Sequence, residues 1–110
     1  MTTDRVPKLL GDLIDALRAA QTLAARGRDA FDTDLAVPLA FEALSNRVGD
    51  LCKQLVAADP ERFSEQDWSL AARNRDVIVH HYHRIRPDTL WATATGDFPR
   101  LLRLAERKAE

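Results

Sequence analysis

Apolar residues recur every three or four positions along most of this chain, which is the period of amphipathic α-helices. In the first such segment the apolar stripe consists of Leu9, Leu10, Leu13, Ile14, Leu17 and Ala20. Pro7 suits the first turn of a helix and Gly27 suits a helix end, so we predict a helix from about Pro7 to Arg26. A polar connection from Arg28 to Asp34 is expected to follow it.

The next periodic segment predicts a long helix from Leu35 to Ala58. Its stripe consists of Leu39, Ala40, Ala43, Leu44, Arg47 or Val48, Leu51 and Leu55. Pro38 has no amide donor, so either the helix begins there or a short turn precedes it. Asp59 stands before Pro60 and is therefore expected to end the helix.

Two more helices are predicted in the second half of the chain. Ser64 is a candidate N-cap with Asp67 at the capping-box position, and the helix that follows is expected to end near Ile85. A fourth helix is expected from Pro87, and Gly96 and Pro99 predict a kink or a break within it.

These four segments define the fold class. No segment predicts a strand, and the short connections favour antiparallel neighbours. The 110 residues fit one domain, residues 1–110. We therefore predict an all-α fold, an antiparallel up-down bundle of four to five helices. A domain this small buries a limited share of its surface, so we also expect it to form a two-fold dimer.

Composition changes this picture little. Aromatic residues make up only 6% of the chain, so the core must consist mainly of Leu, Ala and Val, with Trp68 and Trp91 in the core or an interface. Cys52 is expected to be a buried small hydrophobe. The N-terminal residues contain no apolar signal-peptide region, and no apolar run approaches the ~20 residues that span a membrane. We expect a cytoplasmic protein that does not interact with membranes.

The third helix concentrates the candidate chemistry. The net charge of −1 gives no nucleic-acid signal for the whole molecule. Between Arg73 and Arg86, however, several arginines and all 3 histidines are opposed only by Asp76. This is either a solvated basic face or a proton-transfer site, because a histidine pKa near 6.5 suits proton transfer at neutral pH. His80 and His83 could share a zinc ion, but no second set of ligands accompanies them, so no metal is expected.

The pattern Arg75-x4-His80-x-Tyr82, with a downstream Leu90-Trp91, resembles the HepT branch of the HEPN superfamily, the toxins of type VII HepT/MntA toxin–antitoxin systems. The likeness covers nearly the whole chain and includes the segment Asp97-Phe98-Pro99-Arg100-Leu101-Leu102. It implies a HEPN-like helical fold and a toxin endoribonuclease that works without metal or cofactor.

The resemblance also implies roles for individual residues. His80 would help move the proton of a ribose 2′-hydroxyl, whose oxygen attacks the adjacent phosphate and yields a 2′,3′-cyclic phosphate. Arg75 would face the developing phosphoryl charge. The supporting residues are Asp76, Arg73 and Asn74, and the RNA-binding residues are His81, His83 and Arg84. The partner implied is a minimal nucleotidyltransferase antitoxin, MntA-like, that transfers AMP to Tyr82 and so places negative charge and bulk beside the arginine.

Several alternatives stay open. The superfamily tolerates four or six residues between its arginine and histidine, which selects Arg75 or Arg73; we favour Arg75 because the tyrosine-containing form is usually the shorter one. Asp76 either orients His80 or forms an ion pair with Arg73. On a straight helix Arg75 and His80 point apart, so we expect two motif helices to form a composite cleft in a dimer. The alternative functions are a weakly active adaptor that positions a nucleotidyltransferase, and a structural helical subunit.

Overall fold

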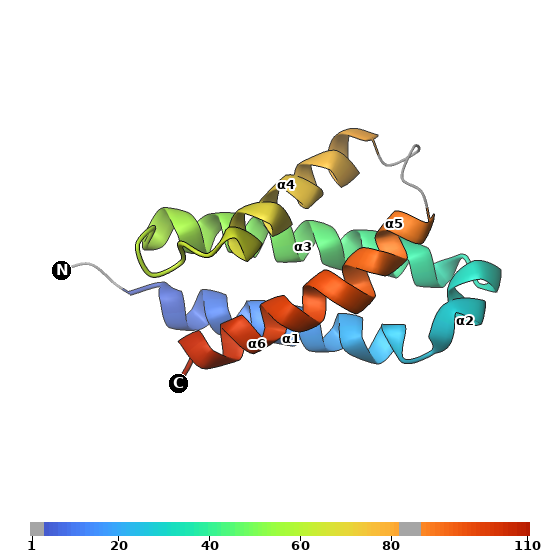
Figure 1. The fold of residues 1–110 in the computed structure, drawn as a ribbon, viewed down its shortest axis with the longest axis horizontal. Helices are drawn as coiled ribbons and strands as arrows, with labels where there is room; N and C mark the ends of the chain where they lie inside the picture. The colour runs from blue at the N-terminus through green and yellow to red at the C-terminus, as the bar shows by residue number, and fades with distance from the viewer. Residues whose placement is uncertain (1–3, 82–86) are drawn as a thin grey trace.

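The structure, a computed structural model, describes residues 4–81 and 87–110, and for residues 76–81 it describes the backbone alone. Every regular element in these ranges is helical, which confirms the all-α bundle. The elements are α1 (Val6–Ala24), α2 (Gly27–Thr33), α3 (Ala36–Ala58), α4 (Gln66–His81), α5 (Pro87–Ala92), a π-helix η2 (Thr93–Asp97) and α6 (Phe98–Lys108). Figure 1 shows α1 and α3 running antiparallel, with α6 beside α1 and α4 on the outer side of α3.

Helix α1 follows the predicted stripe. Its buried residues are Val6, Leu9, Leu10, Leu13, Ile14, Ala16, Leu17 and Ala20, and they face α3 and α6. Pro7 lies in the first turn, where its missing amide removes no helical hydrogen bond. After Ala24 the chain turns at Gly27, whose φ of +89° lies in the left-handed region that glycine adopts without steric cost.

The polar connection predicted between Arg28 and Asp34 is wrong, because this segment forms the short helix α2. A single apolar side chain anchors it: the buried Phe31 ring lies 5.6 Å from the ring of Phe41 and 5.5 Å from that of Trp91. One apolar residue in seven gives no periodicity to detect, so tertiary packing and not local pattern stabilises this helix.

The predicted stripe of α3 is right in its second half and only partly right in its first, where Leu44 packs partly buried against the core. Val48, Leu51 and Leu55 are buried as expected, but Leu39 is 53% exposed. The first half instead buries Val37 and Phe41. Two apolar stripes run along these turns, and the larger burial offered by the Phe41 ring decides which of them faces the core. The helix begins at Ala36, so Pro38 lies in its first turn, where the missing amide removes no helical hydrogen bond.

Helix α4 begins at Gln66, one position later than a Ser64 cap would give, and Glu65 occupies the flanking position. The Trp68 indole Nε1 donates to Glu65 Oε1 at 2.9 Å, and the buried Trp68 ring meets the Phe63 ring edge-on. This confirms Trp68 as a core residue. The predicted end near Ile85 lies outside the described residues.

The irregularity predicted in the last helix is confirmed. Gly96 lies in the π-helix η2, and Pro99 lies in the first turn of α6. The core continues through this region with Leu90, Ala94, Phe98, Leu101, Leu102 and Ala105. No helix in the described ranges is long and apolar enough to cross a membrane.

Candidate functional site

The motif helix α4 packs against α3 at a point where α3 has no side chain. A β-carbon on Gly49 would lie 2.7 Å from the backbone oxygen of Ala71 and 2.9 Å from Cγ of Arg75, and still closer to Arg75 Cβ. Real β-carbons do not approach other atoms so closely, so only glycine fits between the two helices here. Gly49 therefore sets how near the motif helix lies to α3.

Arg75 lies at this same contact. Its side chain is half-buried, and its Nε donates a hydrogen bond to the Asn46 side-chain oxygen at 3.1 Å. A hydrogen bond from a charged donor is stronger than a neutral one. Because Nε belongs to the planar guanidinium itself, a bond at this atom restrains the direction in which the plane faces. The expected catalytic arginine is thus held against α3.

Arg73 is placed differently. It is exposed and lines a shallow groove of about 290 Å³ between α3 and α4, together with Lys53, Val56, Ser69 and Ala72. Both charged residues of this lining, Lys53 and Arg73, are cationic. The groove therefore suits an anion more than a cation. Arg73 is exposed there, whereas Arg75 is half-buried.

Asn74 faces neither α3 nor the groove that Arg73 lines. It is half-buried and lines a small pocket between α4 and the η2–α6 region with Asp67, Leu70, Ala71, Asp97, Phe98, Arg100 and Leu101. The structure thus separates three residues that are neighbours in the sequence. It brings Arg75 to Asn46, and it places neither Arg73 nor Asn74 beside that pair.

The remaining motif residues are described less fully. Asp76, His80 and His81 lie on the helical backbone of α4, whose side chains beyond Arg75 are not described, and Tyr82, His83 and Arg84 lie outside the described residues. Because α4 is helical through His81, Asp76 and His80 lie one turn apart on one stripe, and His80 lies about 140° around the axis from Arg75. Figure 1 shows the C-terminal half of α4 leaning away from the other helices.

A composite site made of Arg75 and His80 from two protomers stays a prediction, because the structure describes the Arg75 side chain but only the backbone of His80.

Within the side chains that the structure describes, no group of three His, Cys, Asp or Glu residues is placed to hold a metal ion. The only cysteine, Cys52, is fully buried, and this burial raises the pKa of its thiol to about 12. Cys52 is thus a neutral thiol of the core, as the sequence predicts.

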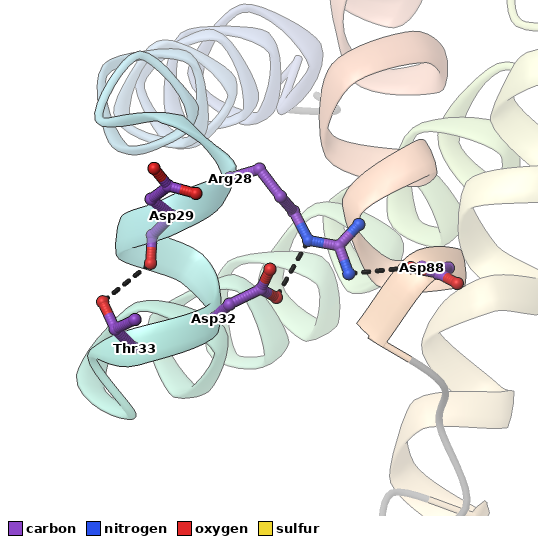
Figure 2. A network of polar contacts seen from close by, with 5 residues as sticks. All are labelled: Arg28, Asp29, Asp32, Thr33 and Asp88. Atoms are coloured by element: carbon purple, nitrogen blue, oxygen red, sulfur yellow. Dashed lines mark hydrogen bonds and ion pairs between the residues drawn. The ribbon is translucent and has the colours of Figure 1, made fainter.

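A polar network joins the helix after the motif segment to the rest of the fold (Figure 2). Arg28 of α2 donates from Nη2 to Asp88 of α5 at 2.7 Å and from Nε to Asp32 at 2.9 Å. Hydrogen bonds to these two carboxylates raise the pKa of Arg28 above its usual value. The network lies on the surface, with Asp88 87% exposed, so it contributes little stability.

Sequence reasoning did not find Asn46, Gly49 or the Arg28 network. A glycine inside a predicted helix often marks a place where another backbone packs closely, so Gly49 could have indicated this contact. Asn46 gave no comparable signal, because its partner Arg75 lies 29 residues away and on another helix.

Comparisons with known proteins point to one family. The family model described as ribonuclease HepT-like matches residues 13–107, a range that contains α2 to α5 and most of α1 and α6. No curated protein and no solved structure matches the chain significantly.

Proposed function

The chain belongs to the HepT-like ribonuclease family, and on that premise we propose that it is the toxin endoribonuclease of a toxin–antitoxin pair. The observation that carries this proposal is the match over residues 13–107, which includes the whole motif helix α4. The motif itself, Arg75-x4-His80-x-Tyr82, supplies the two groups that metal-independent RNA cleavage needs. One is a histidine that can accept a proton, and the other is a cation that faces the phosphate.

In the proposed reaction His80 accepts the proton of a ribose 2′-hydroxyl. The 2′ oxygen then attacks the adjacent phosphorus, the bond from phosphorus to the 5′ oxygen breaks, and the departing oxygen takes up a proton from water. His80 later releases its proton to solvent. The products are a 2′,3′-cyclic phosphate and a 5′-hydroxyl end. Arg75 stabilises the negative charge that builds on the phosphoryl oxygens, and Asp76, one helical turn before His80, supports the histidine.

Burial favours Arg75 over Arg73 as the arginine that faces the reacting phosphate. Arg75 is half-buried, and its solvent-exposed hydrogen bond to Asn46 restrains the guanidinium. Catalysis gains most from groups that need no reorganisation when charge develops. The exposed Arg73 and Lys53 suit looser contacts with the phosphates of neighbouring nucleotides, as do His81, His83 and Arg84.

A two-fold dimer would bring Arg75 of one protomer toward His80 of the other. On one straight helix these two positions lie about 140° apart around the axis. A site that uses both residues on one phosphate is therefore easier to build from two protomers than from one. Mixing purified Arg75→Ala and His80→Ala variants tests it. Heterodimers then contain one intact composite site, so activity returns, whereas sites built within one protomer stay inactive in every mixture.

We further propose that a minimal nucleotidyltransferase antitoxin, MntA-like, silences the enzyme by transferring AMP to Tyr82. The added phosphate brings negative charge and bulk to the motif and so repels RNA. Intact-mass spectrometry of the protein co-expressed with such a partner, in wild-type and Tyr82→Phe form, tests this step. An AMP adduct on the wild type alone supports it, and equal modification of both forms contradicts it.

The function as a whole is tested with purified protein and total RNA or tRNA. We expect cleavage that leaves 2′,3′-cyclic phosphate ends, and a loss on the order of 10²–10⁴ in rate for His80→Ala, the usual contribution of general acid–base help. Asp32→Asn, a surface change in α2, serves as the control and should cleave normally. Absence of both RNA cleavage and growth arrest in the wild type would favour the adaptor function instead.

A further inference from the structure

We propose that Asn46 is a positioning residue for RNA cleavage, and that its side-chain amide holds the Arg75 guanidinium in the orientation that receives the scissile phosphate. This inference rests on the proposed function and adds to it a residue that lies outside the motif, on a different helix. Its starting point is the 3.1 Å hydrogen bond from Arg75 Nε to the Asn46 oxygen.

The hydrogen bond acts on the part of Arg75 that matters for phosphate binding. Arginine recognises phosphate with the flat fork of its guanidinium, so the direction of that plane decides whether two parallel hydrogen bonds form. A free arginine side chain has about 2 kcal/mol of rotamer entropy to lose before it binds. A bond at Nε removes part of that freedom before the substrate arrives, and small misplacements of a catalytic group are costly.

A second contact restrains the other end of the same side chain. Gly49 lies one turn after Asn46 on the same face of α3, because residues three apart are neighbours on a helix. The absence of a side chain at Gly49 lets Cβ and Cγ of Arg75 rest directly against α3. The Cβ–Cγ part of Arg75 thus lies against Gly49 and its Nε is bonded to Asn46, so α3 contacts the side chain at two points.

The chain also contains a similar pair with no link to the motif. Arg5 Nη2 donates to the side-chain oxygen of Gln54 at 3.0 Å, and Gln54 lies on α3 two turns after Asn46. In both pairs an arginine outside α3 donates to a side-chain amide of α3: Arg75 comes from α4, and Arg5 directly precedes α1. Gln54→Ala is therefore a matched control, because it removes an arginine–amide hydrogen bond from the same helix without touching Arg75.

The experiment measures kcat and KM on an oligoribonucleotide, together with the thermal midpoint, for wild type, Asn46→Ala, Asn46→Leu, Gln54→Ala, Arg75→Ala and the Asn46→Ala/Arg75→Ala double variant. We expect both Asn46 variants to lower kcat on the order of 10- to 100-fold with little change in KM. Gln54→Ala should retain the wild-type kcat. In the double variant the Asn46 change should add nothing to the loss caused by Arg75→Ala, because Asn46 acts through Arg75.

The outcomes separate the two proposals. A wild type that does not cleave RNA, or an Arg75→Ala variant that cleaves normally, overturns the proposed function. If both of those controls behave as expected, a normal kcat in the Asn46 variants overturns the positioning role. Additive losses in the double variant overturn it too. Unfolding of both Asn46→Ala and Asn46→Leu assigns Asn46 a structural role and likewise overturns it.

Discussion

Arg75 lies directly over Gly49, and its Cγ is 2.9 Å from the point where a β-carbon of residue 49 would lie. The other glycines do not share this crowding, since a β-carbon on Gly11 or Gly96 would meet nothing within 4 Å. The distance between the motif helix and α3 therefore depends on one position, and so does the placement of the arginine that we assign to catalysis.

Gly49→Ala is expected to destabilise the protein and to impair RNA cleavage. Replacing a helical glycine by alanine normally stabilises by up to about 1 kcal/mol. Here the added methyl group overlaps α4, and overpacking of this kind costs about 1–3 kcal/mol. Gly11→Ala on α1 is the control and should gain stability. Urea unfolding of both variants measures the free energies, and equal stabilisation of the two would contradict the close approach of α3 and α4.

Arg75 and Arg73 should respond differently to substitution. Arg75→Lys keeps the charge but loses the planar fork and the Nε donor, so kcat should fall strongly, on the order of 10²-fold. Arg73→Ala should instead raise KM and flatten the dependence of RNA binding on salt, because it removes an exposed phosphate contact. Kinetics at several salt concentrations measure both effects. The reverse result would assign the catalytic role to Arg73.

Burial of Cys52 predicts a loss of stability in alkali. In the folded protein the pKa of the Cys52 thiol is about 12, whereas a thiol in the unfolded chain has a pKa near 8.5. A pKa raised in the folded state contributes stability that is complete below the unfolded pKa and declines as pH rises above it. The stability advantage of wild type over Cys52→Ala should therefore shrink as the pH rises from about 8.5 toward 12. A constant difference across that range would contradict the buried neutral thiol.

Packing and not charge should hold α2 in place. Phe31→Ala removes a buried ring that contacts Phe41 and Trp91, and such truncations cost about 3–5 kcal/mol. Asp88→Asn breaks an exposed ion pair of Arg28 and should leave the thermal midpoint nearly unchanged, since exposed pairs contribute little. A larger effect for Asp88→Asn than for Phe31→Ala would reverse this assignment.

The sequence predicted those elements whose signal is local and repeated. Helix α1 has one apolar stripe along its whole length, and both its position and its buried face were correct. Helix α2 contains one buried residue, Phe31, whose partners come from distant segments, so its pattern was not detectable. In α3 two apolar stripes compete, and only tertiary packing decides that Phe41 turns inward and Leu39 outward.

The same distinction applies to the site. Arg75, Asp76 and His80 could be predicted as site residues because they form a short motif, and the structure shows that all three lie on one helix, α4. Asn46 could not be predicted, because its contact with Arg75 joins residues 29 positions apart on two helices. Periodicity describes one helix at a time, whereas the orientation of Arg75 arises between two helices.

Ser45 offers a last prediction, because its hydroxyl is a buried polar group without a partner. Among the side-chain atoms that the structure describes, Ser45 Oγ is the one that is buried and makes no hydrogen bond, and it lies next to Asn46 on α3. A buried hydroxyl without a partner carries a desolvation penalty of about 1–3 kcal/mol, which an alanine would not.

Ser45→Ala should therefore stabilise the protein by about 1 kcal/mol or more. Part of any gain comes from the higher helix propensity of alanine, so Ser69→Ala on the exposed face of α4 is the control for that contribution. The difference between the two variants in urea unfolding isolates the effect of burial. Equal gains would mean that the Ser45 hydroxyl has a partner in solution, such as a buried water molecule.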